Sequence, residues 1–369
     1  MNSIPLVDLA AQHAAVAREV AEGWQQVLAT CAFIDGPQVA AFESEYAAFI
    51  GTRHCVGLAN GTDAIEIALR ALGIGPGDEC ILPANTFIAT AGAVCRAGAT
   101  PVLVDCADDG TYLIEVAAVE AAVTARTRAI IPVHLYGQAA PAERLMPIAE
   151  RIGAVLVEDA AQSQGARRNG MAAGALGHAA ATSFYPGKNL GAYGDAGAAL
   201  TGSDDVATRM RMIKNHGSAR KYEHQLVGVN SRLDTLQAVV LSAKLRRLAD
   251  WNAGRRAAAA RYDTLLAELD EVARPRTLDG NEHVWHLYVV RVPDRDQVLK
   301  ELQAAGIGAG IHYPVPIHLT EAFAGLGQPE GTFPVTEQAS RELLSLPLFA
   351  EITAAQQERV VSVLKSALG

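Results

Sequence analysis

Short apolar runs alternate with longer amphipathic stretches between Cys55 and about Leu200. Apolar runs bounded by turn residues are typical of buried strands, and their alternation with helical periodicity indicates a parallel sheet covered by helices. We therefore predict an α/β unit with helices that include Asp63–Leu72, Ala89–Ala97 and Ala142–Ile152. The strands are predicted over residues 55–59, 79–83, 100–105, 128–134, 154–159, 181–185 and 196–201.

The pattern becomes helical and rich in Ala, Leu and Arg from Arg232 to about Leu269. We predict one long helix with a break near Asn252–Gly254 that leads out of the α/β unit. An apolar stretch, a helix over Asp294–Ala305, a loop and two closing helices follow, which predicts a small α+β domain with a meandering sheet. A chain of 369 residues exceeds the usual size of a single core, so we expect two domains, residues 1–245 and 246–369.

The overall charge argues against two classes of partner. Lys and Arg number 31 against 40 Asp and Glu, which gives a net charge of −9 without a long basic run. Such a chain is not expected to bind nucleic acid or an anionic membrane as its main role. The amino terminus has no basic flank followed by an apolar run, and no later stretch is long enough to span a bilayer.

The cysteines are odd in number and scattered, and they show neither Cys-x-x-Cys nor a zinc-binding spacing. We therefore expect a reducing, cytoplasmic location and no metal site. The five cysteines are Cys31, Cys55, Cys80, Cys95 and Cys106.

Two ionisable side chains follow predicted strands. Lys188 lies in SFYPGKNLGAYGDAGA, a turn rich in Gly and Pro, and Asp159 ends the apolar run AVLVED. Taken alone, a lysine is usually a solvated surface residue and such an aspartate is usually a helix cap. A lysine kept from bulk water favours the neutral amine that forms imines, and a carboxylate at this sheet edge reaches a ligand. Pyridoxal phosphate requires this pair, an amine for its aldehyde and a carboxylate for its pyridine nitrogen.

The segment Asn60-Gly61-Thr62-Asp63 lies between a predicted strand and a predicted helix. Small residues there let backbone N–H groups and the helix dipole meet a phosphate, so Gly61, Thr62 and Asp63 are candidates for a phosphate cradle. The same residues also occur as simple turn and cap chemistry. Phe87, after the next predicted strand, is either a stacking partner for a flat ring or a core residue.

Many ordered segments together resemble the sugar aminotransferases of the DegT/DnrJ/EryC1/StrS family, a branch of the fold type I pyridoxal-phosphate enzymes. The resemblance covers essentially the whole chain, with segments at residues 33–51, 59–79, 83–94, 157–166, 183–198, 228–241 and 343–349. It implies an aspartate aminotransferase-like large domain with a mostly parallel sheet, and a small C-terminal α+β domain.

The resemblance also implies roles for single residues. Lys188 would hold the cofactor as a Schiff base and then move protons, and Asp159 would pair with the pyridinium nitrogen. Gln162 would approach the ring hydroxyl, while Phe87 would stack on the ring. The phosphate would be bound by Gly61, Thr62 and Ser183, together with Asn230 of the neighbouring chain in a homodimer. The substrate would be contacted by His312, Tyr313 and His318.

Two positions relate the chain to branches of this family. A dehydratase branch has histidine at the Schiff-base position, whereas this chain has Lys188, which favours transamination. Family members prefer Gly-Asp-Gly-Gly after the lysine loop, and here the run reads Gly194-Asp195-Ala196-Gly197. The extra methyl group of Ala196 is small, so this difference does not count against the resemblance.

The resemblance predicts a ping-pong transfer of an amino group from L-glutamate to a nucleotide-linked keto sugar. The segments are most like those of enzymes that aminate carbon 3 of a dTDP-linked 3-keto-6-deoxyhexose. Enzymes acting on carbon 4, on UDP-linked uronates or on scyllo-inosose are near alternatives. Two other classes are a non-catalytic regulator on the same fold and an NAD-dependent sugar oxidoreductase. The missing G-x-G-x-x-G pattern counts against the oxidoreductase.

Overall fold

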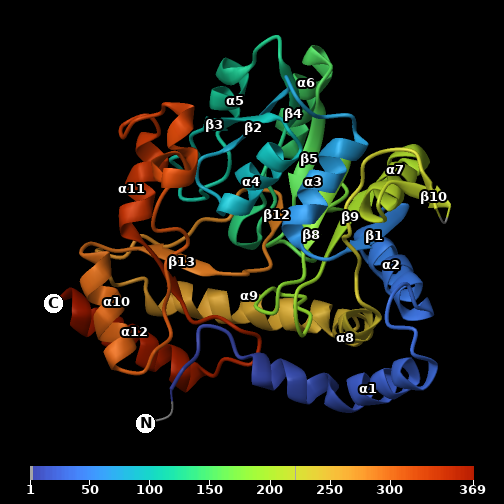
Figure 1. The fold of residues 1–369 in the computed structure, drawn as a ribbon. Helices are drawn as coiled ribbons and strands as arrows, with labels where there is room; N and C mark the ends of the chain where they lie inside the picture. Colours follow the sequence, from blue (N-terminus) through green and yellow to red (C-terminus); the bar gives the residue numbers. More distant parts are fainter. Residues whose placement is uncertain (1–2, 221) are drawn as a thin grey trace.

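A seven-stranded sheet forms the centre of the molecule (Figure 1). The computed structural model describes residues 3–220 and 222–369. The strand order is β1-β9-β8-β5-β4-β2-β3, in which β9 runs antiparallel to both neighbours and the other pairs are parallel. The strands are β1 (His54–Leu58), β2 (Glu79–Pro83), β3 (Thr100–Val104), β4 (Thr127–Ile130), β5 (Val155–Asp159), β8 (Ala179–Ser183) and β9 (Gly197–Thr201). The predicted α/β class with a mostly parallel sheet is therefore confirmed.

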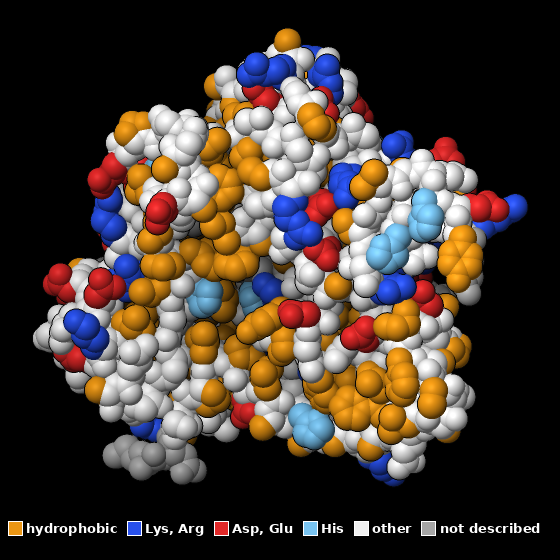
Figure 2. Space-filling model, in the orientation of Figure 1, with side chains coloured by type: hydrophobic (Ala, Val, Ile, Leu, Met, Phe, Trp, Pro, Cys, Tyr) orange, Lys and Arg blue, Asp and Glu red, His pale blue; other side chains and the backbone are white. Residues whose placement is uncertain are grey.

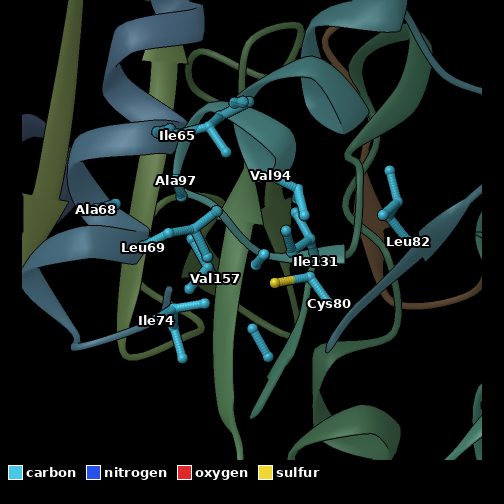
Figure 3. Packing of buried hydrophobic residues seen from close by; sticks show 14 of the residues in the cluster. Ile65, Ala68, Leu69, Ile74, Cys80, Leu82, Val94, Ala97, Ile131 and Val157 are labelled. Carbon is cyan, nitrogen blue, oxygen red and sulfur yellow. The ribbon is translucent and has the colours of Figure 1, made fainter. Parts of the chain in front are cut away.

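Helices cover both faces of this sheet. Helices α3 (Gly61–Ala71), α4 (Ile88–Arg96) and α7 (Asp204–Lys214) pack on one face, where Figure 3 shows Ile65 and Leu69 of α3 beside Val94 of α4. The opposite face is covered by α2 (Pro37–Ile50), α5 (Val116–Ala122), α6 (Ala142–Ile152) and α8 (Thr235–Leu245). Because both faces are buried, the strands read as nearly continuous apolar runs rather than as alternating ones.

The C-terminal part builds a second, smaller core. Strands β13 (Tyr288–Arg291) and β14 (Leu343–Leu346) pair antiparallel, and their buried side chains contact Ile4 near the amino terminus. The helices here are α9 (Leu248–Leu265), α10 (Arg295–Ala304), α11 (Pro334–Glu342) and α12 (Ala354–Leu368). The predicted boundary after residue 245 falls in the turn between α8 and α9, and the division into two domains stays a prediction.

The remaining elements complete the described residues. Helix α1 (Leu9–Thr30) packs along α8. Three 3-10 turns are η1 (Leu135–Gly137), η2 (Ile317–Leu319) and η3 (Glu321–Leu326). Short strand pairs involve β6 (Arg167–Arg168), β7 (Met171–Ala172), β10 (Ser218–Arg220), β11 (Glu223–His224) and β12 (Asn281–Glu282). Among the described helices, none combines the length and hydrophobicity needed to cross a bilayer.

Some sequence predictions about element ends were wrong, among them the strand predicted at 128–134, which ends at Ile130. The long helix breaks at residues 246–247, between α8 and α9, rather than near Asn252–Gly254, which lie inside α9. A Cβ at Gly254 would lie 2.8 Å from the Ala350 carbonyl oxygen, so this glycine permits close packing and does not end the helix. The strand predicted at 181–185 ends at Ser183, which leaves Phe184 and Tyr185 in the following loop.

The carboxyl edge of the sheet brings three segments together. Asp159 ends β5 and Ser183 ends β8, and the two strands are parallel neighbours. Ser183 also pairs with Gly197 at the start of β9, so residues 184–196 form a loop above this edge. Two residues separate the end of β1 from the start of α3, which lies at the same edge of the sheet. Ligands of parallel α/β sheets bind at this edge, which makes it the place to look for a site.

Candidate active site

A cavity of about 590 Å³ lies at the carboxyl edge of the sheet. Figure 2 shows histidine and basic side chains at the centre of the corresponding face, surrounded by hydrophobic side chains. Nine residues predicted from the sequence line the cavity, namely Gly61, Thr62, Phe87, Asp159, Gln162, Ser183, Lys188, His312 and Tyr313. Residues from distant parts of the chain therefore meet in one place.

Lys188 lies half-buried in the loop that follows β8. Its N–H donates to the Tyr185 carbonyl oxygen at 2.8 Å, and the loop is held from below by Lys244, whose Nζ donates to the Gly191 carbonyl at 2.7 Å. Burial lowers the pKa of Lys188 from 10.5 to about 8, although the nearby Asp159 carboxylate acts in the opposite direction. Near neutral pH about a tenth of the side chains are therefore the neutral, nucleophilic amine, far more than at the ordinary pKa of a lysine.

Asp159 is fixed by two hydrogen bonds. Thr90 donates its hydroxyl to Oδ2 at 2.7 Å, and the N–H of Ala161 donates to Oδ1 at 3.2 Å. Asp159 is 5 % exposed and lines the cavity, so its carboxylate is largely shielded from water. A buried carboxylate held in this way suits a cationic partner in the cavity.

The first turn of α3 presents free backbone donors to the cavity. The Asn60 side chain caps the helix by accepting from the N–H of Asp63 at 2.8 Å. The N–H groups of Gly61 and Thr62 have no acceptor among the described residues. A Cβ at Gly61 would lie 2.7 Å from the Cβ of Ser183, so glycine is required for this close approach. Free N–H groups at a helix start form a binding site for an anion.

Gln162 and Tyr313 connect two walls of the cavity. Gln162 accepts the N–H of Tyr136 on Oε1 at 2.6 Å and donates from Nε2 to the Tyr313 hydroxyl at 3.0 Å. Phe87 lies beside the Tyr313 ring, with 5.3 Å between ring centroids. Burial raises the pKa of Tyr313, with the Asp159 charge adding to the effect, and burial lowers the pKa of His312 to about 4. Both side chains are therefore neutral at neutral pH.

Two predicted contacts are corrected by the structure. The Asp63 carboxylate pairs with Arg96 and accepts from Ser231. The N–H of Asp63 donates to the capping side chain of Asn60, and Asp63 does not line the cavity. His318 is buried outside the cavity, where its Nε2 is 3.0 Å from Glu337. The Asp63 carboxylate and the His318 ring therefore have hydrogen-bond partners within the protein, and no ligand is needed to explain their positions.

Asn230 lies outside the main cavity of its own chain. It is exposed and lines a second depression of about 420 Å³ together with Arg232, Asp234 and Gln237. Asp195 lines both the depression and the main cavity, so the two adjoin. The position is compatible with a contact to another copy of the chain, and the predicted role of Asn230 stays a prediction.

Several cavity residues had no sequence signal of their own. Thr90 stands in PANTFIAT, and only the fold shows that its hydroxyl reaches Asp159. Tyr185 falls within a predicted strand, and the sequence marks Asp195 only as part of a glycine run. His286 sits in an apolar stretch that predicts a buried strand, and nothing there indicates that it reaches the cavity.

Comparison with known proteins identifies the family. The model of the DegT/DnrJ/EryC1/StrS aminotransferase family matches residues 15–365. The chain belongs to this aminotransferase family. It is a pyridoxal-phosphate-dependent enzyme, as expected from the sequence.

Individual family members are similar along their whole length. A pleiotropic regulatory protein of Geobacillus stearothermophilus is 48% identical over 97% of each chain. The dTDP-3-amino-3,4,6-trideoxy-alpha-D-glucose transaminase of Streptomyces venezuelae is 45% identical over 98% of this chain and 95% of its own. A crystal structure of S. venezuelae DesV in complex with a ketimine intermediate superposes with a TM-score of 0.97, at 44% identity, covering 99% of this chain and 98% of DesV.

The residues of the cavity fit the cofactor of this aminotransferase family. Lys188 offers an amine, Asp159 a carboxylate and the start of α3 free N–H groups, and all three line one cavity. The missing Cβ of Gly61 leaves the helix start close to Ser183, a second donor for a phosphate. These are the groups that an aldehyde, a pyridinium nitrogen and a phosphate require.

Proposed function

We propose that this aminotransferase moves the amino group of L-glutamate to carbon 3 of a dTDP-linked 3-keto-6-deoxyhexose in the cytoplasm. The observation that carries the chemistry is the meeting of Lys188 and Asp159 in one cavity beside the first turn of α3. The choice of sugar is supported by the Streptomyces venezuelae relative, whose name states a dTDP-3-amino sugar. The cytoplasmic location is supported by the cysteines, each of which is unpaired in the described residues.

The side chains divide the work of the reaction. When bound, pyridoxal phosphate supplies an aldehyde that condenses with amines and a protonated ring that takes up carbanion charge. Lys188 would take the proton from the reacting carbon of the amino donor and deliver it to the former aldehyde carbon of the cofactor, because burial brings the pKa of its amine to about 8 and leaves part of it neutral. Asp159 holds the proton on the ring nitrogen. Gly61, Thr62 and Ser183 would bind the phosphate, Phe87 would stack on the ring, and Gln162, His312 and Tyr313 line the remaining walls.

We further propose that the active form is a homodimer in which Asn230 completes the phosphate site of the partner subunit. The exposure of Asn230 and the depression that joins the main cavity at Asp195 support this. Shared sites of this kind place the same surface on both sides of a two-fold axis.

Product analysis tests the proposed substrate. The purified protein is incubated with glutamate and a panel of dTDP- and UDP-linked 3-keto and 4-keto sugars, and products are analysed by mass spectrometry and NMR. We expect an amine at carbon 3 of the dTDP-linked 3-keto sugar, and no product with a Lys188→Ala variant. Amination at carbon 4 alone, or of UDP sugars alone, would contradict the choice of sugar.

A regulatory role is the second candidate, because the Geobacillus relative is named a pleiotropic regulatory protein. The cavity retains Lys188 and Asp159, which a purely regulatory chain does not need. The absorbance of the bound cofactor separates the two. A catalyst changes its visible spectrum when glutamate is added and recovers it with 2-oxoglutarate, whereas a chain that only binds the cofactor does not.

A further inference from the structure

A chain of buried amides runs behind Lys188. Asn189, the next residue, is 1 % exposed and donates from Nδ2 to the Val284 carbonyl at 3.0 Å and to Oδ1 of Asn252 at 2.9 Å. Asn252, in α9, donates from its own Nδ2 to the Gln164 carbonyl at 2.9 Å. Two backbone carbonyls, which only accept, thus fix the orientation of both amides.

This fixed orientation sets the tautomer of His286. Because Nδ2 of Asn189 already donates both of its hydrogens, the amide presents its oxygen, Oδ1, to Nδ1 of His286 at 3.3 Å. An amide oxygen only accepts, so Nδ1 of the ring carries the proton and Nε2 carries the lone pair. The histidine is therefore held as a hydrogen-bond acceptor on its second nitrogen.

The second nitrogen is available to a ligand. His286 lines the same cavity as Lys188, and within residues 3–220 and 222–369 its Nε2 has no hydrogen-bond partner. The ring stays neutral because burial lowers its pKa well below 6.5, and the charges of Lys188 and Arg255 act in the same direction. The peptide unit is also fixed, since Nη1 of Arg255 donates to the Trp285 and His286 carbonyls at 3.1 and 3.4 Å.

We propose that Nε2 of His286 accepts a hydrogen bond from a hydroxyl of the keto sugar next to the carbon at which Lys188 acts. Lys188 and His286 line the same cavity, and Asn189, which is bonded to Lys188 through the backbone, holds the His286 ring. The carboxylates of glutamate have no proton to donate and its amino nitrogen is the reacting atom, so we assign this acceptor to a hydroxyl of the sugar. The inference rests on the proposed function.

A matched pair of variants tests the role of Nε2. His286→Asn keeps a donor toward Asn189 and removes Nε2, whereas His286→Gln places an amide near the position of Nε2. We expect His286→Asn to lower kcat/KM for the keto sugar about 3- to 10-fold, the effect of one neutral hydrogen bond. The rate of the glutamate half-reaction, followed by cofactor absorbance in single turnovers, should stay within about twofold of wild type. His286→Gln should recover part of the loss.

A substrate analogue tests the same contact without any variant. A keto sugar that lacks the neighbouring hydroxyl should lose about the same factor in kcat/KM with the wild-type enzyme, and His286→Asn should lose nothing more with this analogue. His54→Asn is the control for a histidine outside the cavity, where the ring pairs with Asp204 near the surface.

Three results would overturn the inference while leaving the proposed function intact. An unchanged kcat/KM for the sugar in a folded His286→Asn variant would show that Nε2 binds no hydroxyl. Equal losses in both half-reactions would show that the ring serves Lys188 instead. Full activity of the wild type on every deoxy analogue would exclude the contact without reference to any variant. If the wild type aminates no keto sugar although glutamate changes its spectrum, the proposed function fails, and the inference fails with it.

Discussion

The protonation of Lys188 should govern how fast the protein without cofactor captures pyridoxal phosphate. Burial lowers the pKa of this amine from 10.5 to about 8, so the neutral form is scarce below pH 8 and predominates above it. We expect the capture rate to rise about tenfold per pH unit from pH 6 and to level off above about pH 8. Stopped-flow absorbance measures the rate. A rise that continues at the same slope toward pH 10.5 would show a lysine with its ordinary pKa.

Asp159 should matter for the chemical step and little for folding. An amide at this position cannot keep the ring nitrogen protonated through an ion pair, although it still fits the space beside Thr90. We expect Asp159→Asn to cut the rate of the glutamate half-reaction by about 100-fold or more, with a melting temperature close to that of the wild type. Asp204→Asn, at an exposed position in α7, is the matched control. A near wild-type rate in Asp159→Asn would assign the ring nitrogen to another group.

Residues at strand ends were predictable from the sequence, whereas residues behind them were not. Asp159 and Lys188 follow apolar runs, so their place at the sheet edge follows from the pattern. The side chain of His286 depends on amides at positions 189 and 252, which no local pattern connects. His318 stands in a segment with a strong family resemblance, yet its ring is taken by Glu337.

At the scale of elements, the contact between the start of α3 and the end of β8 should be sensitive to a single methyl group. A Cβ at Gly61 would lie 2.7 Å from Cβ of Ser183, so Gly61→Ala forces the two apart. Overpacking costs about 1–3 kcal/mol, and we expect the dissociation constant for the cofactor to rise about tenfold or more. Equilibrium titration of absorbance measures it.

A second glycine provides the control for that substitution. Gly92 lies within α4, and a Cβ there would meet nothing within 4 Å. Gly92→Ala should leave cofactor binding unchanged and stabilise the fold by about 0.5–1 kcal/mol, since alanine favours a helix. Equal binding by the Gly61→Ala variant and the wild type would mean that the start of α3 does not hold the phosphate.

The sequence predicted the elements of the main sheet well and their directions less well. All seven predicted strands are present, because runs buried on both faces are recognisable as continuous apolar segments. The antiparallel direction of β9 has no such signal, since an apolar run reads the same in either direction. The misplaced helix break has a similar cause, because Gly254 serves the packing against Ala350, which lies far away in the sequence.

At the scale of the whole molecule, the proposed homodimer predicts that two inactive variants complement each other. Lys188→Ala and Asn230→Ala should each be impaired alone. In a mixed dimer, one of the two sites contains both native residues and the other lacks both. One site of the two should therefore be active in each heterodimer. Verified heterodimers, purified through two different tags, are assayed beside their parents. Heterodimers as inactive as the parents would place Asn230 in its own chain only.

The central claim is that Lys188 holds pyridoxal phosphate in the cavity at the sheet edge. Sodium borohydride reduces the carbon–nitrogen double bond between a lysine and the cofactor aldehyde, which makes the link permanent. Peptide mapping by mass spectrometry then locates the phosphopyridoxyl group. We predict that it lies on Lys188, in the peptide that contains SFYPGKNLGAYGDAGA, and that the Lys188→Ala variant carries none. A phosphopyridoxyl group on a different lysine, or on none in the cofactor-loaded wild type, would contradict the account.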